Sequence, residues 1–313
     1  MRIFCGDASE ILLKLVEETK AQSVHWSRCY EPWRIARDKK IKNALQELGV
    51  SANSHNGSLL WEPWTILKGD QTPYKVYTPY YKNGCLNAPE PRQPLPAIKD
   101  IRFAQSPVTG GECSLKALKL EPATDWSSGI KKVWQVGEDA AASKLENFIE
   151  NGLHQYKVGR DFPASNCTSL LSPHLHFGEI SPHQVWHRIK QEEAQFGSDD
   201  LIHYLREIAW REFSYYLLYH WPHIPEAPFN PKYAAFPWRH DEQALGQWQK
   251  GQTGFPIIDA GMRELWQTGY MHNRVRMIVA SFLVKNQLIN WREGEAWFWD
   301  CLVDADLASN SAS

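Results

Sequence analysis

The chain changes its hydrophobic period once along its length, and this change limits the folds open to it. In the first 53 residues, short runs typical of strands alternate with helical patterns. The strand-like runs are 2–4, 23–26 and 50–53, and the helical patterns cover 8–20 and 32–48. Pro32 and Gly49 stand at the two ends of the second helical pattern, where these residues usually bound helices. Strand alternating with helix predicts a parallel α/β sheet.

From residue 140 onward the periodicity is helical almost throughout. The long amphipathic segments are 199–219, 259–268 and 272–288. Prolines cluster between 89 and 96, where the periodic pattern is lost, although 73–82 is compatible with a helix. We therefore predict an incomplete parallel, Rossmann-like sheet followed by an all-α domain. The predicted boundaries are 1–60 for the α/β part, 61–139 for a connector and 140–313 for the helical domain.

The composition excludes several classes of protein. The formal net charge of −2 gives no overall basic field, so any nucleic-acid contact must come from a local patch. The six cysteines form no CxxC pair, which argues against a zinc site and favours a reducing, cytoplasmic location. Acidic residues in the first 20 positions are atypical of a signal peptide, and the apolar run at 277–284 is too short to span a bilayer. The 15 tryptophans fit packing better than base stacking or electron hopping.

Two segments of the helical part carry side chains suited to a binding site. The segment 168–172, TSLLS, places hydroxyls and consecutive amides before a proline, which can bind phosphate or simply cap a helix. Glu207, Trp210 and Arg211 share one helical face, so they can bind a base through an acid and a stacked ring. A surface ion pair beside a core tryptophan is the alternative, and taken singly each simpler alternative is favoured.

A third segment, MHNRVRM, places Asn273 and Arg276 on one helical face. A buried arginine would need a carboxylate partner, which Asp304 or Asp306 in the segment DADLASN could supply. The alternative is a charged helix followed by a polar turn.

The order and spacing of these pieces resemble the class I cyclobutane pyrimidine dimer photolyases of the photolyase/cryptochrome family. The similarity covers residues 154–313 and runs through GRDFP, TSLLSPHLHFGEISP, EIAWREF, TGFPIIDAGMREL, GYMHNRVRMIVASFLVKNQLINWREGE and DADLASN. Upstream, VHWSRCYEPWRIARD and PYKVYTPYYK resemble the α/β domain and connector of that family.

This resemblance implies light-driven repair of pyrimidine dimers in DNA by electron transfer from excited, reduced FAD. The helical domain would bind FAD, with Arg276 paired to Asp306, and no protein nucleophile, general base or metal is implied. The residues that would line the FAD site are Tyr156, Thr168, Ser169, Leu170, Leu171, Ser172, Arg211, Asn273, Arg276, Asp304, Ala305, Asp306 and Asn310.

The resemblance also implies a pocket for a flipped dimer, which is weakly stacked in the duplex and easier to extrude than normal bases. The residues that would act on the lesion are Glu207, Trp210, Asn273 and Met277. The DNA contacts would be Glu207, Trp210, Arg211, Ser214, Asn273 and Arg274. Trp238 and Trp291 match the outer and middle members of the family's electron-transfer chain, whose third member would follow DADLASN.

The chain departs from the family in three places. It begins at the equivalent of a later strand and ends just after DADLASN, so we expect a polypeptide that lacks both ends, binds FAD weakly and aggregates. Trp33 and Arg34 replace the Asn-Glu pair of folate-binding members, which argues against folate; the antenna, folate or deazaflavin, stays undetermined. We expect a monomer that binds damaged DNA and no membrane.

Two other functions are compatible with the same scaffold: a cryptochrome-type blue-light sensor, and a non-catalytic fragment of a photolyase. Asn273 in the segment HNR differs from the plant cryptochromes, whose sequence resembles HDR at this position. Met277 differs from the 6-4 type, which has a histidine-rich segment in this region. Both differences favour repair of cyclobutane dimers.

Overall fold

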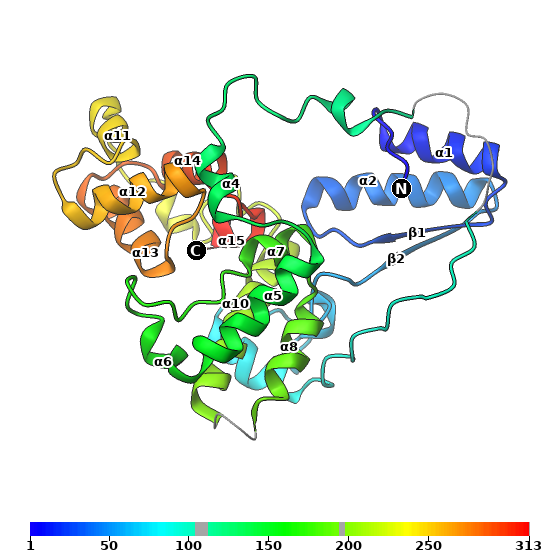
Figure 1. Ribbon diagram of the computed structural model, residues 1–313, viewed down its shortest axis with the longest axis horizontal. Helices are drawn as coiled ribbons and strands as arrows, with labels where there is room; N and C mark the ends of the chain where they lie inside the picture. The colour runs from blue at the N-terminus through cyan, green and yellow to red at the C-terminus, as the bar shows by residue number, and fades with distance from the viewer. Residues whose placement is uncertain (104–111, 194–197, 313) are drawn as a thin grey trace. The chain divides into compact units, whose positions relative to one another are not determined.

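A computed structural model describes residues 1–103, 112–193 and 198–312 (Figure 1). Backbone contacts divide the chain into two compact units. One unit consists of Met1–Ser58 and Pro94–Trp126, and the other of Leu59–Gln93 and Ser127–Ser313. The segment predicted as a connector, 61–139, is therefore shared between the two units.

The first unit is a small parallel α/β element, as the alternating pattern predicted. Its elements are α1 (Ala8–Thr19), β1 (Ser23–Ser27), α2 (Pro32–Glu47), β2 (Ser51–His55) and the short turn η4 (Leu115–Leu118). The two strands pair in parallel, from Ser23 opposite Ser51 to Ser27 opposite His55. The strand predicted over 2–4 is wrong, because Phe4 forms only an isolated antiparallel bridge with Glu112.

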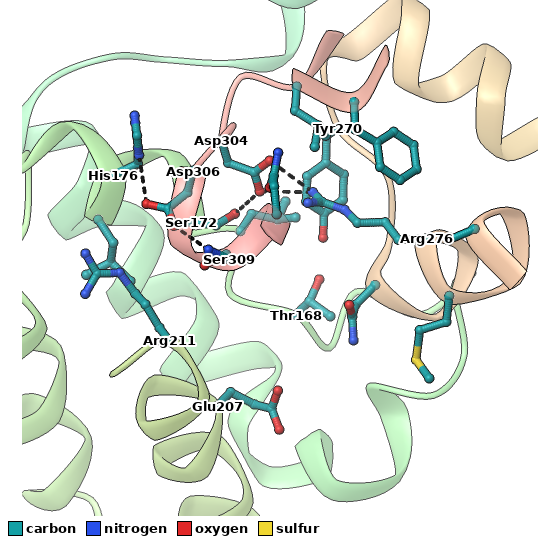
Figure 2. A pocket seen from close by; sticks show the side chains of 18 of the residues that line it. Thr168, Ser172, His176, Glu207, Arg211, Tyr270, Arg276, Asp304, Asp306 and Ser309 are labelled. Carbon is teal, nitrogen blue, oxygen red and sulfur yellow. Dashed lines mark hydrogen bonds and ion pairs between the residues drawn. The ribbon is translucent and has the colours of Figure 1, made fainter. Parts of the chain in front are cut away.

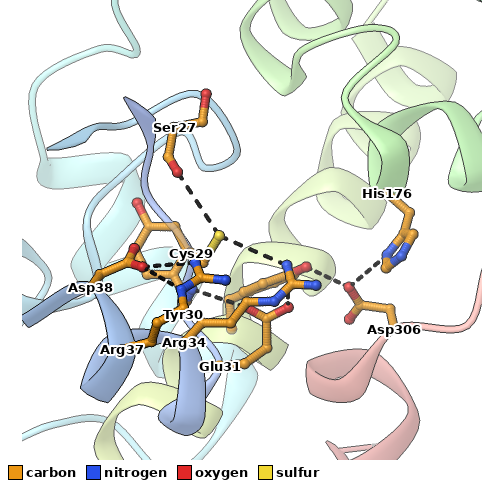
Figure 3. A network of polar contacts seen from close by, with 10 residues as sticks. Ser27, Cys29, Tyr30, Glu31, Arg34, Arg37, Asp38, His176 and Asp306 are labelled. Carbon is orange, nitrogen blue, oxygen red and sulfur yellow. Dashed lines mark hydrogen bonds and ion pairs between the residues drawn. The ribbon is translucent and has the colours of Figure 1, made fainter. Parts of the chain in front are cut away.

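Apolar packing and polar contacts fix the helices of this unit. The core consists of Val16, Ile41, Leu45 and Val50. In the second turn of α2, Arg37 pairs with Asp38 at 2.7 Å, and Figure 3 shows Cys29 beside this pair. Asp38 also accepts a hydrogen bond from Trp26 Nε1 at 2.9 Å, which ties α2 to β1.

The second unit is helical and contains the candidate site. Its longer helices are α5 (Glu138–Asn151), α8 (Pro182–Lys190), α10 (Ser198–His220), α11 (Glu242–Gln249), α12 (Pro256–Thr268), α13 (Asn273–Ser281) and α14 (Trp291–Cys301). Shorter helical segments are η1 (Pro63–Thr65), α3 (Tyr77–Pro79), η2 (Tyr80–Gly84), η3 (Cys85–Asn87), α4 (Ser128–Val133), η5 (Leu153–Gln155), α6 (Tyr156–Gly159), α7 (Ser172–Phe177), η6 (Pro231–Tyr233), η7 (Phe282–Asn286) and α15 (Leu307–Ala312).

Two of the three long helices predicted from periodicity are confirmed, and the third is shorter than predicted. The segment predicted as one helix over 272–288 forms α13 up to Ser281 and then widens into the π-type turn η7. Phe282 and Leu283 of that turn are buried, so an apolar period continues although the hydrogen-bond pattern changes.

Helices α12 and α13 pack closely against each other (Figure 1), and residues of α13 line the site. Gly261 permits this approach, because a Cβ atom there would lie 2.4 Å from Cγ1 of Val275. Fully buried Trp248 packs in one hydrophobic core with residues of α12 and α13, and it donates Nε1–H to the carbonyl of Val279 at 3.0 Å. Within the described residues, no helix is both long enough and apolar enough to cross a membrane.

Candidate cofactor and substrate site

A cavity of about 480 Å³ lies within the second unit, and segments far apart in the sequence line it (Figure 2). Most of the predicted site residues meet there. Those that line it are Tyr156, Thr168, Ser169, Leu170, Leu171, Ser172, Glu207, Arg211, Asn273, Arg276, Met277, Trp291, Asp304, Asp306 and Asn310. A largely apolar cavity with a few convergent polar groups is typical of sites for small molecules and cofactors.

Asp304 and Arg276 form an ion pair in the wall of this cavity. Arg276 Nη2 lies 2.9 and 3.2 Å from the two carboxylate oxygens of Asp304, and Arg276 Nε donates to the carbonyl of Met271 at 2.7 Å. The hydroxyl of Ser172 donates to the same carboxylate at 2.6 Å. The predicted pairing of Arg276 with Asp306 is therefore wrong, because the guanidinium is held by Asp304, two residues earlier.

Asp306 has its own set of partners. Tyr215 donates its hydroxyl to Asp306, the backbone amide of Ser309 donates at 2.8 Å, and His176 Nδ1 lies 3.4 Å away. Burial tends to raise the pKa of Asp306, but the hydrogen bonds and the nearby Arg211 guanidinium lower it to about 2. The cavity therefore keeps a buried carboxylate ionised at neutral pH.

The loop 168–172 lines the cavity and contains a sharp backbone turn. Leu170 has a left-handed φ of +52°, which turns the backbone sharply between Thr168 and Ser172. The N-cap position of α7 makes no side-chain cap hydrogen bond, and the Ser172 hydroxyl is used by Asp304. Simple helix capping thus does not explain these hydroxyls.

Arg211 and Glu212 connect the cavity to the segment that begins the second unit. Arg211 Nη1 lies 3.6 Å from Glu212 Oε1, while Glu212 Oε2 accepts hydrogen bonds from the amides of Leu60 and Trp61 at 2.8 and 3.3 Å. Burial raises the pKa of Glu212 to about 8, against the opposing effect of Arg211 and the two amides. Glu212 was not among the predicted residues.

A row of partly exposed ion pairs lies at one edge of the cavity, where Glu207 is a lining residue. Glu207 pairs with Arg160, and Arg274 pairs with Asp161, with Nη2 and Nε of Arg274 at 2.6 and 2.7 Å from Asp161 Oδ1. Arg160 and Asp161 belong to the GRDFP segment, but neither was assigned a role from sequence. Their partners are 47 and 113 residues away, so spacing gave no sign of the contacts.

Trp210 lies outside the set of cavity-lining residues and is 45 % exposed, so it is not the core tryptophan of the alternative interpretation. Its ring stacks on Tyr77 with the centroids 3.6 Å apart and the planes 9° from parallel. Ser214 is buried and its hydroxyl donates to the carbonyl of Trp210 at 3.2 Å. This position gives no support to the predicted DNA contact of Ser214.

Of the remaining predicted residues, some line the cavity and others lie outside it. Ala305 packs against the hydrophobic core and Arg274 belongs to the row of ion pairs, so neither lines the cavity. Trp291 lines the cavity, whereas Trp238 contacts Phe236, with ring centroids 4.3 Å apart. Lining residues that sequence reasoning missed include His176, Tyr204, Trp248, Tyr270, Glu295 and Ser309.

The cavity wall fits FAD by the chemistry of its donors and acceptors. Asn310 Nδ2 is buried and has no hydrogen-bond partner among the described residues, so a ligand acceptor would satisfy it. Carboxylates, two arginines and the hydroxyl-bearing loop surround the same space, which suits a ligand that has both phosphates and a polar ring system (Figure 2). The helical unit and this site define a protein of the FAD-binding type.

Comparisons with known proteins place the chain more closely. Residues 204–313 match the family described as the FAD binding domain of DNA photolyase, and residues 1–99 match the DNA photolyase family. A deoxyribodipyrimidine photo-lyase of Agrobacterium fabrum is 46 % identical over 309 residues, covering 98 % of this chain and 64 % of the relative. Cryptochrome-1 of Arabidopsis thaliana is 36 % identical over 97 % of this chain and 46 % of its own length.

The fold agrees with a solved structure. A bacterial class III photolyase from Agrobacterium tumefaciens superimposes with a TM-score of 0.93 at 47 % identity, over 98 % of this chain and 63 % of that one. The chain therefore belongs to the photolyase/cryptochrome family, with photolyase-type and FAD-binding domains. Assignment to class I is not confirmed, because this similar structure is of class III. The chain spans about 64 % of the length of the curated photo-lyase that it matches.

Proposed function

We propose that this protein is a deoxyribodipyrimidine photo-lyase, which repairs cyclobutane pyrimidine dimers in DNA by light-driven electron transfer from reduced FAD. The observation that carries the proposal is a juxtaposition. One cavity has buried carboxylates suited to a cofactor, while Glu207 and Met277 also line it and the exposed indole of Trp210 lies one helical turn from Glu207. Cofactor and lesion could therefore meet without a protein nucleophile.

The proposed FAD site uses the buried groups of the cavity. Asp304, Asp306 and Asn310 would hold the flavin ring, since two of these side chains offer acceptors and the third offers an unsatisfied amide N–H. Tyr156 and the hydroxyls of 168–172 would hold the phosphates and the ribityl chain. When bound, reduced FAD supplies the electron that opens the cyclobutane ring. Ala305 contributes no side chain to the cavity.

The proposed lesion site uses the exposed groups at the edge of the cavity. Glu207 would exchange Arg160 for the base edges of the flipped dimer, and Trp210 would stack on it. Asn273 and Met277 would contact the lesion beside the cofactor, and Arg274 would meet the DNA backbone.

The proposal also covers the class of photolyase, the oligomeric state and the antenna chromophore. We place the protein with class III and not class I, on the 47 % identity to the solved class III photolyase. We propose a monomer that acts on damaged DNA, with the residues 140–313 as its FAD-binding part and 1–60 as the part that holds a folate or deazaflavin antenna.

The test is repair by the purified protein and its Trp210→Ala variant. Thymine-dimer oligonucleotides are illuminated with near-UV or blue light in the presence of reduced FAD, and recovery of base absorbance is followed. The visible spectrum gives the FAD content. Loss of the stacked indole should weaken dimer binding by about 1–3 kcal/mol. Trp266→Ala is the matched control, because Trp266 is also exposed and stacked, on Trp297 at 5.8 Å, yet lies on α12, which contributes no residue to the cavity, whereas Trp210 shares α10 with Glu207.

Light-dependent recovery that falls in Trp210→Ala and persists in Trp266→Ala supports the proposal. If the protein binds flavin and the flavin is photoreduced, but base absorbance does not recover, the repair function is wrong. A light-sensor function then takes its place, and the similarity to Cryptochrome-1 makes this the second candidate. Protein that retains no FAD at all would favour a non-catalytic role.

A further inference from the structure

Three aromatic rings form a column that ends at the surface. Tyr81 stacks on Tyr77 with planes 6° apart and centroids at 5.8 Å, and Tyr77 stacks on Trp210 with planes 9° apart at 3.6 Å. The first two rings are 8 and 4 % exposed, whereas Trp210 is 45 % exposed. One face of the indole therefore lies against a buried ring, while Trp210 itself remains accessible at the surface.

Tyr77 is itself fixed in place. Its hydroxyl donates to the carbonyl of Arg206 at 2.8 Å, which attaches the ring to α10 one turn before Trp210. Phe213, also on α10, meets the rings of Tyr77 and Trp210 edge-on, at 5.9 and 6.0 Å. Tyr77 thus has a hydrogen bond and ring contacts on two sides, while the indole that it supports has an exposed side.

We propose that Tyr77 is a positioning residue for lesion recognition, which it serves by holding the indole plane of Trp210. This inference rests on the proposed function, in which Trp210 stacks on a flipped dimer. An indole free to rotate would lose conformational entropy when a base stacks on it, whereas an indole already held flat loses less. Tyr77 therefore contributes to selectivity for the dimer without touching it.

Three variants at this position separate the parts of the side chain. Tyr77→Phe keeps the ring and removes only the hydrogen bond to Arg206. Tyr77→Leu removes the stack, and Tyr77→Met removes it while filling the space with a flexible chain that preserves the fold if the leucine variant does not. Tyr74→Leu is the matched control, since Tyr74 is a buried tyrosine whose ring contacts Tyr80 and not Trp210.

The measurement is the ratio of affinities for thymine-dimer and undamaged oligonucleotides, by fluorescence anisotropy in the dark, together with thermal unfolding. We expect Tyr77→Leu and Tyr77→Met to lower this ratio about three- to tenfold, as loss of an aromatic pair would. Tyr77→Phe should keep the ratio within about twofold of the parent, because its ring still stacks. Tyr74→Leu should lower thermal stability and leave the ratio unchanged.

A double-mutant cycle shows whether Tyr77 acts through Trp210. In a Trp210→Ala background, Tyr77→Met should have no further effect on the ratio, although it still lowers thermal stability. An equal drop in both backgrounds overturns the inference, and so does an unchanged ratio in both Tyr77→Leu and Tyr77→Met. A parent protein with no preference for the dimer at all contradicts the proposed function itself, which separates the two failures.

Discussion

The two sides of the cavity hold their charges in different ways. On the buried side, which we call the floor, Asp304 and Asp306 are 9 and 7 % exposed, and each accepts hydrogen bonds from side chains on other segments. On the exposed side, the rim, Glu207 and Asp161 pair with Arg160 and Arg274, and these two acids have side chains 31 and 50 % exposed. The floor is pre-organised for a ligand that stays, and the rim is suited to partners that exchange.

This difference follows from solvent. A buried ion pair that loses one partner leaves a charge with neither water nor a counter-ion, so its disruption is costly. An exposed pair exchanges its partner for water or for another ion at little cost. Substitutions on the two sides should therefore differ in size, and α13 offers a matched comparison, because Arg276 pairs with the floor and Arg274 with the rim.

The largest effect is expected for Arg276→Leu. It leaves the carboxylate of Asp304, whose side chain is 6 % exposed, without its counter-ion. We expect a loss of about 3 kcal/mol in the free energy of unfolding and poor FAD retention. Urea titration and the flavin absorbance measure both quantities. Arg274→Leu, the control, should cost less than about 1 kcal/mol. Similar losses in the two variants would remove the distinction between floor and rim.

Acid stability provides the second comparison. The pKa of Asp306 is lowered from 3.8 to about 2, so its contribution to stability is present above about pH 4 and is lost as the pH falls toward 2. Tyr215→Phe removes a donor to this carboxylate and should cost about 2 kcal/mol at neutral pH. It should also move the midpoint of acid unfolding upward. On the rim, Asp161→Asn should leave that midpoint unchanged, and an unmoved midpoint in Tyr215→Phe would contradict the assignment of the floor.

The helices behind the floor give a third, smaller effect. Gly261→Ala would place a methyl group 2.4 Å from Cγ1 of Val275 and push α13 away from α12. We expect a loss of about 1–2 kcal/mol in thermal or urea unfolding, since overpacking outweighs the gain in helix propensity. Gly246→Ala is the control, because α11 leaves its Cβ position open, and it should stabilise by about 0.5–1 kcal/mol. A stabilised Gly261→Ala variant would mean that Val275 and α13 shift to accept the methyl group without loss of stability.

Sequence reasoning was more successful for the floor than for the rim. Helical spacing placed Asn273 and Arg276 on one face, and the need of a buried arginine for a carboxylate narrowed its partner to two aspartates. It could not choose between Asp304 and Asp306, because these two residues stand on an irregular segment whose direction depends on tertiary packing. The partner of Glu207 lies 47 residues away, and no periodicity reports such a contact.

For some of the residues that were not predicted, the sequence contained a pattern that could have identified them, and for others it did not. Tyr215 follows Arg211 by four positions on α10, so the same facial spacing that grouped Glu207 with Arg211 could have included it. Tyr77 supports Trp210 from 133 residues away, in a segment that was predicted only as a connector with a helix in it. Stacking between such segments depends on the folded chain, and aromatic content by itself predicts packing without its geometry.

The smallest expected effect concerns Asp161 and the use of the rim. Asp161 competes with any external anion for Arg274, to which it lies 2.6 Å away. Asp161→Asn should change the free energy of unfolding by less than about 0.5 kcal/mol, because the pair is exposed. Under the proposed function it should strengthen binding to damaged and undamaged DNA alike, since a phosphate contact carries no lesion specificity.

Anisotropy titrations at several salt concentrations test this, with the salt dependence of the affinity growing by the equivalent of about one phosphate contact at most. The ratio of the two affinities should stay constant, in contrast to the fall expected for Tyr77→Met. A gain confined to damaged DNA would mean that Asp161 acts on the lesion site, and the rim would then share the selectivity that we assign to the aromatic column. Weaker binding to both DNAs would show that Asp161 holds Arg274 in its binding position, so that the rim is pre-organised as the floor is.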